Sequence, residues 1–212
     1  MVAATPEASP ETRTRKPKGQ GHERRAEILA AAKALILAEG DAGFTTRQLA
    51  ARVGLSQTGL YVYFKSREEI FDALCRESFA ALAAEFRAVE TSIPPGRERL
   101  RALGRAYIGF GLAHPNEYRL TFMDGPGVAK HPMTGLEAPF DSQGAGNQVF
   151  LMIRRNLEAA LAAEGKLETQ DLTLATHTVW FALHGLVAAF IARPLFLKAE
   201  PAALIEAMLA SL

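Results

Sequence analysis

The sequence predicts an all-α protein of about nine helices, in which a three-helix head precedes a larger helical bundle. Apolar residues recur at three- and four-residue spacing along most of the 212 residues, and no stretch alternates as a strand does. Helix breakers separate these periodic stretches, among them Gly40, Pro94-Pro95-Gly96, His114-Pro115 and Arg193-Pro194.

The composition is that of a soluble globular protein. Hydrophobic residues make up 49% of the chain and charged residues 22%, which is enough apolar material for a real core. The net charge is only +1, but residues 1–65 hold 10 Lys and Arg against 6 Asp and Glu, whereas residues 66–212 hold 14 against 17. The basic excess therefore lies near the N-terminus, and the change of sign predicts two functional parts.

Cysteine usage and hydropathy predict a cytoplasmic protein without a membrane partner. Cys75 is the single cysteine, so no intramolecular disulfide can form, and we expect a small buried hydrophobe there. The N-terminus lacks the apolar core of a signal peptide. The most apolar run, residues 178–192, is shorter than the roughly 20 residues of a membrane span and carries His184, which favours a buried helix.

Residues 45–67, TTRQLAARVGLSQTGLYVYFKSR, predict two short helices joined by a tight turn. Thr45 and Gln48 have the spacing of a capping box, Gly54 suits a left-handed helix end, and Ser56 can cap the second helix. The positions expected to pack between the helices are apolar: Leu49, Ala50, Val53, Leu60 and Phe64. Such a short turn forces the steep crossing of a helix-turn-helix.

The outward face of the second helix lacks carboxylates, as a helix that enters the major groove should. It carries Gln57, Thr58, Gly59, Tyr61 and Tyr63. A merely structural corner between two helices is the alternative. We favour DNA recognition because the caps, the turn glycine, the small Ala50 and the apolar positions all agree in register.

A first helix at 23–39, ended by Gly40, completes the predicted head, with Phe44 packed beneath the helix-turn-helix. Residues 1–21 predict a flexible basic arm. Its cluster of Arg13, Arg15, Lys16 and Lys18 is either a solvated tail or a contact to DNA phosphates or the minor groove. We therefore expect a DNA-binding domain at 22–65 and an effector-binding and dimerisation domain at 66–212.

The larger domain is expected to hold helices at 66–89, 97–113, 116–123, 147–164, 170–192 and 201–211, with a loop at 124–141. Ser66 and Glu69 predict a second capping box, and Thr169 is the expected cap of 170–192. That helix is apolar nearly all round, so both of its faces should be covered. With 147–164 it carries more apolar surface than a monomer can bury, which predicts a two-fold homodimer.

These motifs resemble the TetR family of transcriptional regulators, most clearly over 24–75. The most specific signature is Leu60-Tyr61-x-Tyr63-Phe64 followed by Lys65-Ser66-Arg67-Glu68-Glu69. His114-Pro115-x-x-Tyr118-Arg119-Leu120 and Trp180-x-x-x-His184-Gly185 look like the WHG-type ligand domain of one subgroup. The resemblance implies a homodimer that binds a palindromic double-stranded DNA operator, a small-molecule effector held in the C-terminal bundle, and subunit pairing through the last two helices.

The resemblance also implies individual DNA-binding residues: Arg47, Ser56, Gln57, Thr58, Gly59, Tyr61, Tyr63, Lys65 and Arg67. Arg47 and the residues 57–59 match positions close to base edges, and the remaining side chains match groove or phosphate positions. Gly59 departs from the bulkier residue that is usual there, which leaves specificity at that position to backbone approach or DNA shape.

An effector pocket is predicted within 97–192, lined by Tyr107, Phe110, Tyr118, Phe122, Met152, His177, Trp180 and His184. These side chains suit a mostly apolar cavity for an apolar or aromatic effector, with the loop at 124–141 as its entrance. The alternative for each of them is a plain core position.

No cofactor, metal or enzymatic activity is predicted. The histidines are scattered (His22, His114, His131, His177 and His184), and only the last two share a helix face, with Trp180, where they are core residues or effector contacts. Three functions remain: a ligand-responsive DNA-binding repressor, an interaction protein whose helix-turn-helix contacts only protein, and a helical-bundle enzyme or carrier with a pocket near Trp180.

Overall fold

The computed structural model describes residues 21–123, 145–194 and 198–212, which form nine α-helices and no strand, so the all-α prediction is confirmed. The chain divides into two compact units, Met1–Ile70 and Phe71–Leu212. This division lies five residues beyond the boundary expected from the sequence, in the first turn of a helix. The predicted arm at 1–21, but for its last residue, and the whole of the predicted loop at 124–141 lie outside the described residues.

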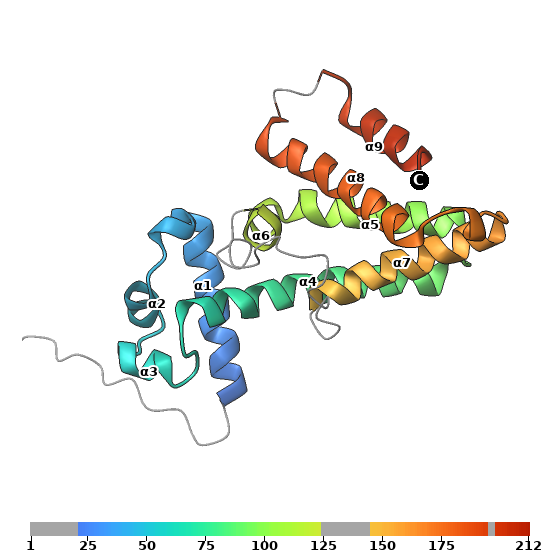
Figure 1. Cartoon of the computed structure of the whole chain (residues 1–212). Helices are drawn as coiled ribbons and strands as arrows, with labels where there is room; N and C mark the ends of the chain where they lie inside the picture. The colour runs from blue at the N-terminus through green and yellow to red at the C-terminus, as the bar shows by residue number, and fades with distance from the viewer. Residues whose placement is uncertain (1–20, 124–144, 195–197) are drawn as a thin grey trace, which may run out of the picture. The chain divides into compact units, whose positions relative to one another are not determined.

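Three helices form the core of the first unit: α1 (Gly21–Gly43), α2 (Thr46–Arg52) and α3 (Gln57–Tyr61) (Figure 1). α1 packs on α2, and α2 packs on α3. The prediction that Gly40 ends the first helix was wrong, because α1 continues to Gly43. A glycine inside a helix costs only about 1 kcal/mol relative to alanine, so it does not stop a helix by itself.

The predicted caps of the helix-turn-helix are confirmed. The Thr45 hydroxyl accepts the Gln48 N–H at 3.2 Å, and the Gln48 side chain accepts the Thr45 N–H at 3.0 Å. Gly54 has φ 67°, a left-handed conformation that glycine adopts without steric cost. The Ser56 hydroxyl accepts the Gly59 N–H at 3.0 Å and so begins α3.

α4 (Arg67–Ser92) begins in the first unit and continues into the second. Its start follows the predicted capping box with one change. The Ser66 hydroxyl accepts the Glu69 N–H at 3.2 Å, but the Glu69 carboxylate accepts the Lys65 N–H at 2.6 Å, one residue earlier than the pattern predicts. This bond and the nearby Arg25 guanidinium lower the pKa of Glu69.

The second unit is a helical bundle made of the rest of α4 and the elements α5 (Arg97–Ala113), α6 (Pro115–Tyr118), a π-helix (Arg119–Met123), α7 (Ala145–Ala163), a 3-10 turn (Leu167–Thr169), α8 (Leu172–Ala192) and α9 (Pro201–Ala210). α8 packs on α5 and α7, and α5 also contacts α7 and α9 (Figure 1). These elements enclose one apolar core, to which each of the six α-helices contributes buried side chains, and the π-helix and the 3-10 turn contribute partly buried ones.

Asp171, rather than Thr169, caps α8. Its carboxylate accepts the N–H groups of Thr173 at 2.9 Å and Leu174 at 3.0 Å. Thr169 cannot serve because its hydroxyl donates to the Lys166 carbonyl at 2.9 Å and closes the 3-10 turn. A carboxylate also interacts favourably with the positive end of the helix dipole, which the threonine hydroxyl does not.

Only one face of α8 is covered within a single chain, so the prediction that both faces are covered was wrong for the monomer. Val179, Leu183 and Val187 are buried, whereas the side chains of Leu174 and Phe181 are 66% and 60% exposed. With 21 residues, α8 is also longer than the apolar run noted in the sequence. By length and composition it could cross a membrane, but the core helix of a soluble protein passes the same test.

Candidate nucleic-acid interface and effector site

The residues predicted to contact bases lie on the surface of α2 and α3. Arg47, Gln57 and Thr58 are exposed, and the Gln57 amide donates to the Thr46 hydroxyl at 3.3 Å. The Ser56 hydroxyl lies at the start of α3, where it is occupied as the helix cap. These side chains are therefore exposed on α2 and α3, and the bond between Gln57 and Thr46 joins the starts of the two helices.

Gly59 stands where a larger side chain would disturb this surface. A Cβ atom added there would lie 3.2 Å from the Ser56 Oγ and 3.7 Å from Leu55. The serine hydroxyl that caps α3 would therefore have to move by a few tenths of an ångström. The missing side chain at this position thus leaves the cap undisturbed.

Three of the four residues predicted at groove or phosphate positions line a surface hollow of about 580 Å³. Tyr61, Lys65 and Arg67 line it together with Thr45 and Thr46 at the start of α2. Tyr61 is 43% exposed and Lys65 is exposed. Arg67 is half-buried, with its guanidinium 5.5 Å from the centre of the Phe44 ring, and Tyr63 is half-buried as well.

Two arginines of α1 support this surface, and the sequence analysis did not single them out. Arg24 donates to the Val53 carbonyl at 2.6 Å, at the end of α2. Arg25 donates to the Tyr63 carbonyl, lies 4.0 Å above the Phe64 ring and pairs with Glu69. Their positions at the start of an amphipathic helix indicate this supporting role only weakly, because arginines there are usually solvated.

Five of the predicted effector-site residues form one aromatic cluster in the second unit. The rings of Tyr118 and Phe122 are 4.6 Å apart, and Phe122 also contacts Tyr107 at 6.2 Å. Trp180 stacks on His184 at 5.3 Å with an angle of 6° between the planes. The two motifs at His114–Leu120 and Trp180–Gly185 thus meet, although they are more than 60 residues apart in sequence.

A hydrogen-bonded chain runs through this cluster. The hydroxyls of Tyr107 and Tyr118 are 2.9 Å apart, and the Tyr118 hydroxyl is 2.7 Å from His184 Nδ1. Burial raises the pKa of both tyrosines and lowers the pKa of His184, so all three groups are neutral near pH 7. With the imidazole proton on Nε2, Tyr118 donates to His184 and accepts from Tyr107, which satisfies each hydroxyl.

The other three predicted residues take no part in these hydrogen bonds or in the aromatic cluster. Phe110 is buried and contacts the His114 ring at 5.1 Å, and Met152 is a core residue of α7. His177 is half-buried, between Phe150 at 4.9 Å and Phe181 at 6.1 Å. The eight residues therefore divide into five that form the hydrogen-bonded aromatic cluster and three that lie outside it.

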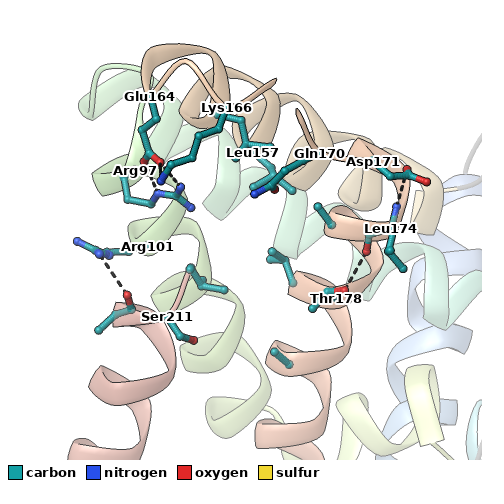
Figure 2. A pocket seen from close by; sticks show the side chains of 16 residues that line it. Arg97, Arg101, Leu157, Glu164, Lys166, Gln170, Asp171, Leu174, Thr178 and Ser211 are labelled. Atoms are coloured by element: carbon teal, nitrogen blue, oxygen red, sulfur yellow. Dashed lines mark hydrogen bonds and ion pairs between the residues drawn. The ribbon is translucent and has the colours of Figure 1, made fainter. Parts of the chain in front are cut away.

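A hollow of about 690 Å³ lies elsewhere in the second unit, between α5, α7, α8 and α9. Figure 2 shows Arg97, Glu164 and Lys166 grouped at its rim and Leu174 and Thr178 on the wall formed by α8. Arg97 donates twice to Glu164, at 2.7 Å each, and holds the pKa of that carboxyl at about 2. Because none of the predicted effector residues lines it, this hollow is not the predicted pocket.

The titration of His184 should make the stability of the protein depend on pH. Because its pKa is lowered from 6.5 in the folded state, the unfolded chain binds a proton that the folded chain does not. The contribution of His184 to the free energy of unfolding should therefore be fully present above pH 6.5. Below that pH the free energy of unfolding should fall, by at most about 1.4 kcal/mol per pH unit for one proton.

Urea denaturation at pH 7.5, 6.5 and 5.5 at constant ionic strength measures this effect. His184→Gln should lose some stability at every pH, because Tyr118 keeps only an imperfect partner, but its stability should fall less steeply between pH 6.5 and 5.5. Equal slopes in the two proteins would show that His184 is protonated as readily in the folded chain as in the unfolded one.

Two other predicted features concern metals and the cysteine. Among the residues with described positions, no three His, Cys, Asp or Glu side chains come together as metal ligands. Cys75 is half-buried rather than fully buried, and desolvation raises the pKa of its thiol. Its thiol is therefore protonated near neutral pH, which makes it a weak nucleophile.

Comparison with known families gives two matches that together span most of the described chain. The model of bacterial regulatory proteins of the tetR family matches residues 28–74, which hold α2, α3 and most of α1. The model of the tetracyclin repressor-like C-terminal domain matches residues 100–212, more than half of the chain.

Individual relatives are more distant. The chain is 29% identical over 176 residues to the nucleoid occlusion factor SlmA of Escherichia coli, covering 79% of this chain and 83% of that protein. A protein of unknown function from Rhodococcus sp. RHA1 is 26% identical with a TM-score of 0.69, covering 88% of this chain and 91% of its own. FadR from Bacillus subtilis, solved in complex with stearoyl-CoA, shares the fold at 17% identity and a TM-score of 0.68, and the match covers 87% of this chain and 95% of FadR.

Proposed function

The chain belongs to the tetR family of bacterial regulatory proteins, and from that premise we propose that it is a cytoplasmic repressor. It binds a palindromic operator as a homodimer and is released by a small apolar effector. The first unit reads DNA through α2 and α3. The second unit holds the effector and pairs the two subunits.

One observation supports operator binding most strongly. α3 presents Gln57 and Thr58 to solvent, and the exposed side chains of Arg47, Tyr61 and Lys65 flank it on the same unit. Apart from Leu60, which is buried, α3 carries polar, aromatic or glycine residues and no carboxylate. Polar donors without like charges suit both base edges and phosphates.

Single alanine substitutions on this surface should separate base contacts from phosphate contacts. Lys65→Ala should lower affinity for every duplex and flatten the salt slope by about one. Gln57→Ala and Arg47→Ala should instead relax base preference, by roughly 1–3 kcal/mol if each side chain reads a base. Tyr61→Ala should weaken operator binding without changing the fold, since its side chain is largely exposed.

Fluorescence anisotropy with duplexes selected from a random pool, at several salt concentrations, measures both effects. Thr91→Ala on α4, an exposed residue far along the chain from α2 and α3, serves as the control and should bind like the wild type. Wild-type affinity in all four surface variants would contradict the assignment and favour a protein partner for the helix-turn-helix.

The exposed apolar stripe of α8 supports the homodimer. Leu174 and Phe181 are seven residues apart, two helical turns, so they lie on one face of the helix. Leu174 also lines the hollow between α5, α7, α8 and α9, which a second subunit would cover together with the stripe. Recognition helices of such a dimer would address half-sites about 34–36 Å apart.

The aromatic cluster supports an apolar effector. Tyr107, Tyr118 and His184 are neutral hydrogen-bonding groups among aromatic rings, the composition of a site that binds an apolar body through few polar anchors. No charged side chain is fully buried among the described residues, so a buried ionic group would lack a partner there. The effector acts by binding the DNA-competent and DNA-incompetent states with different affinities.

A screen of uncharged apolar small molecules by Trp180 fluorescence, repeated with operator present, tests this part. Trp180 is the single tryptophan, so the signal reports on the cluster directly. A coupling of about 1–3 kcal/mol would change affinity about 5–150-fold between the two conditions. Compounds that bind equally well with and without DNA would show a pocket but no switch.

The similarity to a nucleoid occlusion factor supports a second candidate function. Under this second candidate function, the chain binds DNA at many sites of the nucleoid and does not control a promoter. Mapping of the bound sites on the genome distinguishes the two candidates. Sites confined to promoters support the repressor, and sites spread through coding DNA support the second candidate.

A further inference from the structure

Thr46 and Gln57 are joined across the turn of the helix-turn-helix. The Gln57 Nε2 donates to the Thr46 Oγ1 at 3.3 Å. Each residue is the first of its helix, and each helix start is held by a neighbouring cap, Thr45 for α2 and Ser56 for α3. Thr46 is half-buried.

From this bond we propose that Thr46 is a positioning residue, which holds the Gln57 amide in a place from which it recognises adenine. The inference rests on the proposed DNA-binding function and adds to it a source of base specificity. Thr46 itself contacts no base in this scheme.

The Gln57 amide can bond to Thr46 and still recognise a base. Nε2 carries two hydrogens, and donation of one to Thr46 leaves the other, beside Oε1, as a donor and acceptor pair. Adenine offers the complementary pair in the major groove, an acceptor at N7 and a donor at N6.

Loss of this bond would change selectivity more than affinity. Only the duplex that carries adenine gains from a Gln57 amide already held in place, so its binding weakens while contacts elsewhere keep the remaining affinity. A glutamine side chain also has several rotatable bonds, and each one that is left unfixed must be ordered at the moment of binding. The Thr46 methyl group, by contrast, has no part in the amide's orientation.

Two substitutions separate the hydroxyl from the rest of the side chain. Thr46→Val keeps the shape and removes the acceptor, whereas Thr46→Ser keeps the acceptor and removes the methyl group. Each is made in the wild-type chain and in Gln57→Ala. Affinity is measured for duplexes selected by the wild type that carry each of the four base pairs in turn at the position that Gln57 reads.

We expect the wild type to prefer adenine at that position roughly tenfold. Thr46→Val should reduce this preference to about threefold or less, and Thr46→Ser should retain it. In the Gln57→Ala background, which has lost the preference, Thr46→Val should have no further effect. Circular dichroism melting shows whether each variant is folded under the binding conditions.

Three results would overturn the inference. Thr46→Val could retain the adenine preference, or it could lower affinity equally for all four duplexes in both backgrounds, which is the behaviour of a phosphate contact. Alternatively, Gln57→Ala could leave the preference unchanged, which would show that Gln57 reads no base. Failure of the proposed function would look different, because the wild type would then select no sequence from the pool.

Discussion

Replacement of Phe181 by glutamate should convert the proposed dimer into a monomer and lower operator affinity at least about a hundredfold. Phe181 lies on α8 with its side chain 60% exposed in the single chain, where its only ring neighbours in the described residues are Trp180 and His177. Burial of such a side chain contributes about 1.5–3 kcal/mol to the free energy of association, and a two-fold interface buries two copies of it. A glutamate at the same place would bring two unpaired carboxylates into the interface.

Affinity falls along with assembly because the two heads act together. Binding of one half-site places the second head at high effective concentration over the other, and a monomer loses that advantage without losing any contact. Light scattering at micromolar concentration measures assembly, and anisotropy with a full operator and with a single half-site measures the two affinities. Half-site affinity should be unchanged in the variant.

Two further variants make this test specific. Leu174→Glu, two turns away on the same stripe, should behave like Phe181→Glu. Leu112→Glu on α5, where the leucine is also exposed, should remain dimeric, because it makes the same chemical change away from α8. A dimeric Phe181→Glu protein would place the subunit contact on another surface, and a monomeric Leu112→Glu protein would show that any added charge disrupts assembly.

The helix-turn-helix could be predicted almost residue by residue because its signals are local. Thr45, Gly54 and Ser56 act on backbone groups within a few residues of themselves, so their roles can be inferred from spacing alone. The cap of α8 is equally local, but the prediction of Thr169 was wrong, and Asp171 holds that place. The carboxylate prevailed because it accepts two N–H groups and the threonine hydroxyl was already engaged.

The candidate effector site was only partly predictable because its contacts are distant in sequence. The Tyr118 and His184 side chains are 66 residues apart, and a helical pattern gives their faces but not their partners. Their meeting could be expected only from the two motifs of the resemblance. The supporting roles of Arg24 and Arg25 had no signal of that kind, since each bonds to a backbone carbonyl that any residue could supply.

Alanine substitutions of two glycines on α5 should change stability in opposite directions. A Cβ at Gly111 would lie 2.4 Å from Val187 Cγ1 and 3.0 Å from the Tyr118 ring. Val187 is fully buried and stiff at χ1, and the Tyr118 hydroxyl is held by two hydrogen bonds, so neither neighbour can yield easily. Gly111→Ala should therefore cost about 1–3 kcal/mol of stability and disturb the bonds of the aromatic cluster.

Gly109→Ala, two residues earlier on the same helix, is the matched control. Its Cβ would meet no described atom within 4 Å, so the substitution should stabilise the protein by about 0.4–1 kcal/mol through the higher helix propensity of alanine. Urea denaturation midpoints at equal protein concentration measure both changes, because the stability of a dimer depends on concentration. A gain of stability in both variants would show that propensity alone governs α5, and that the close approach of Val187 and Tyr118 to the helix does not constrain residue 111.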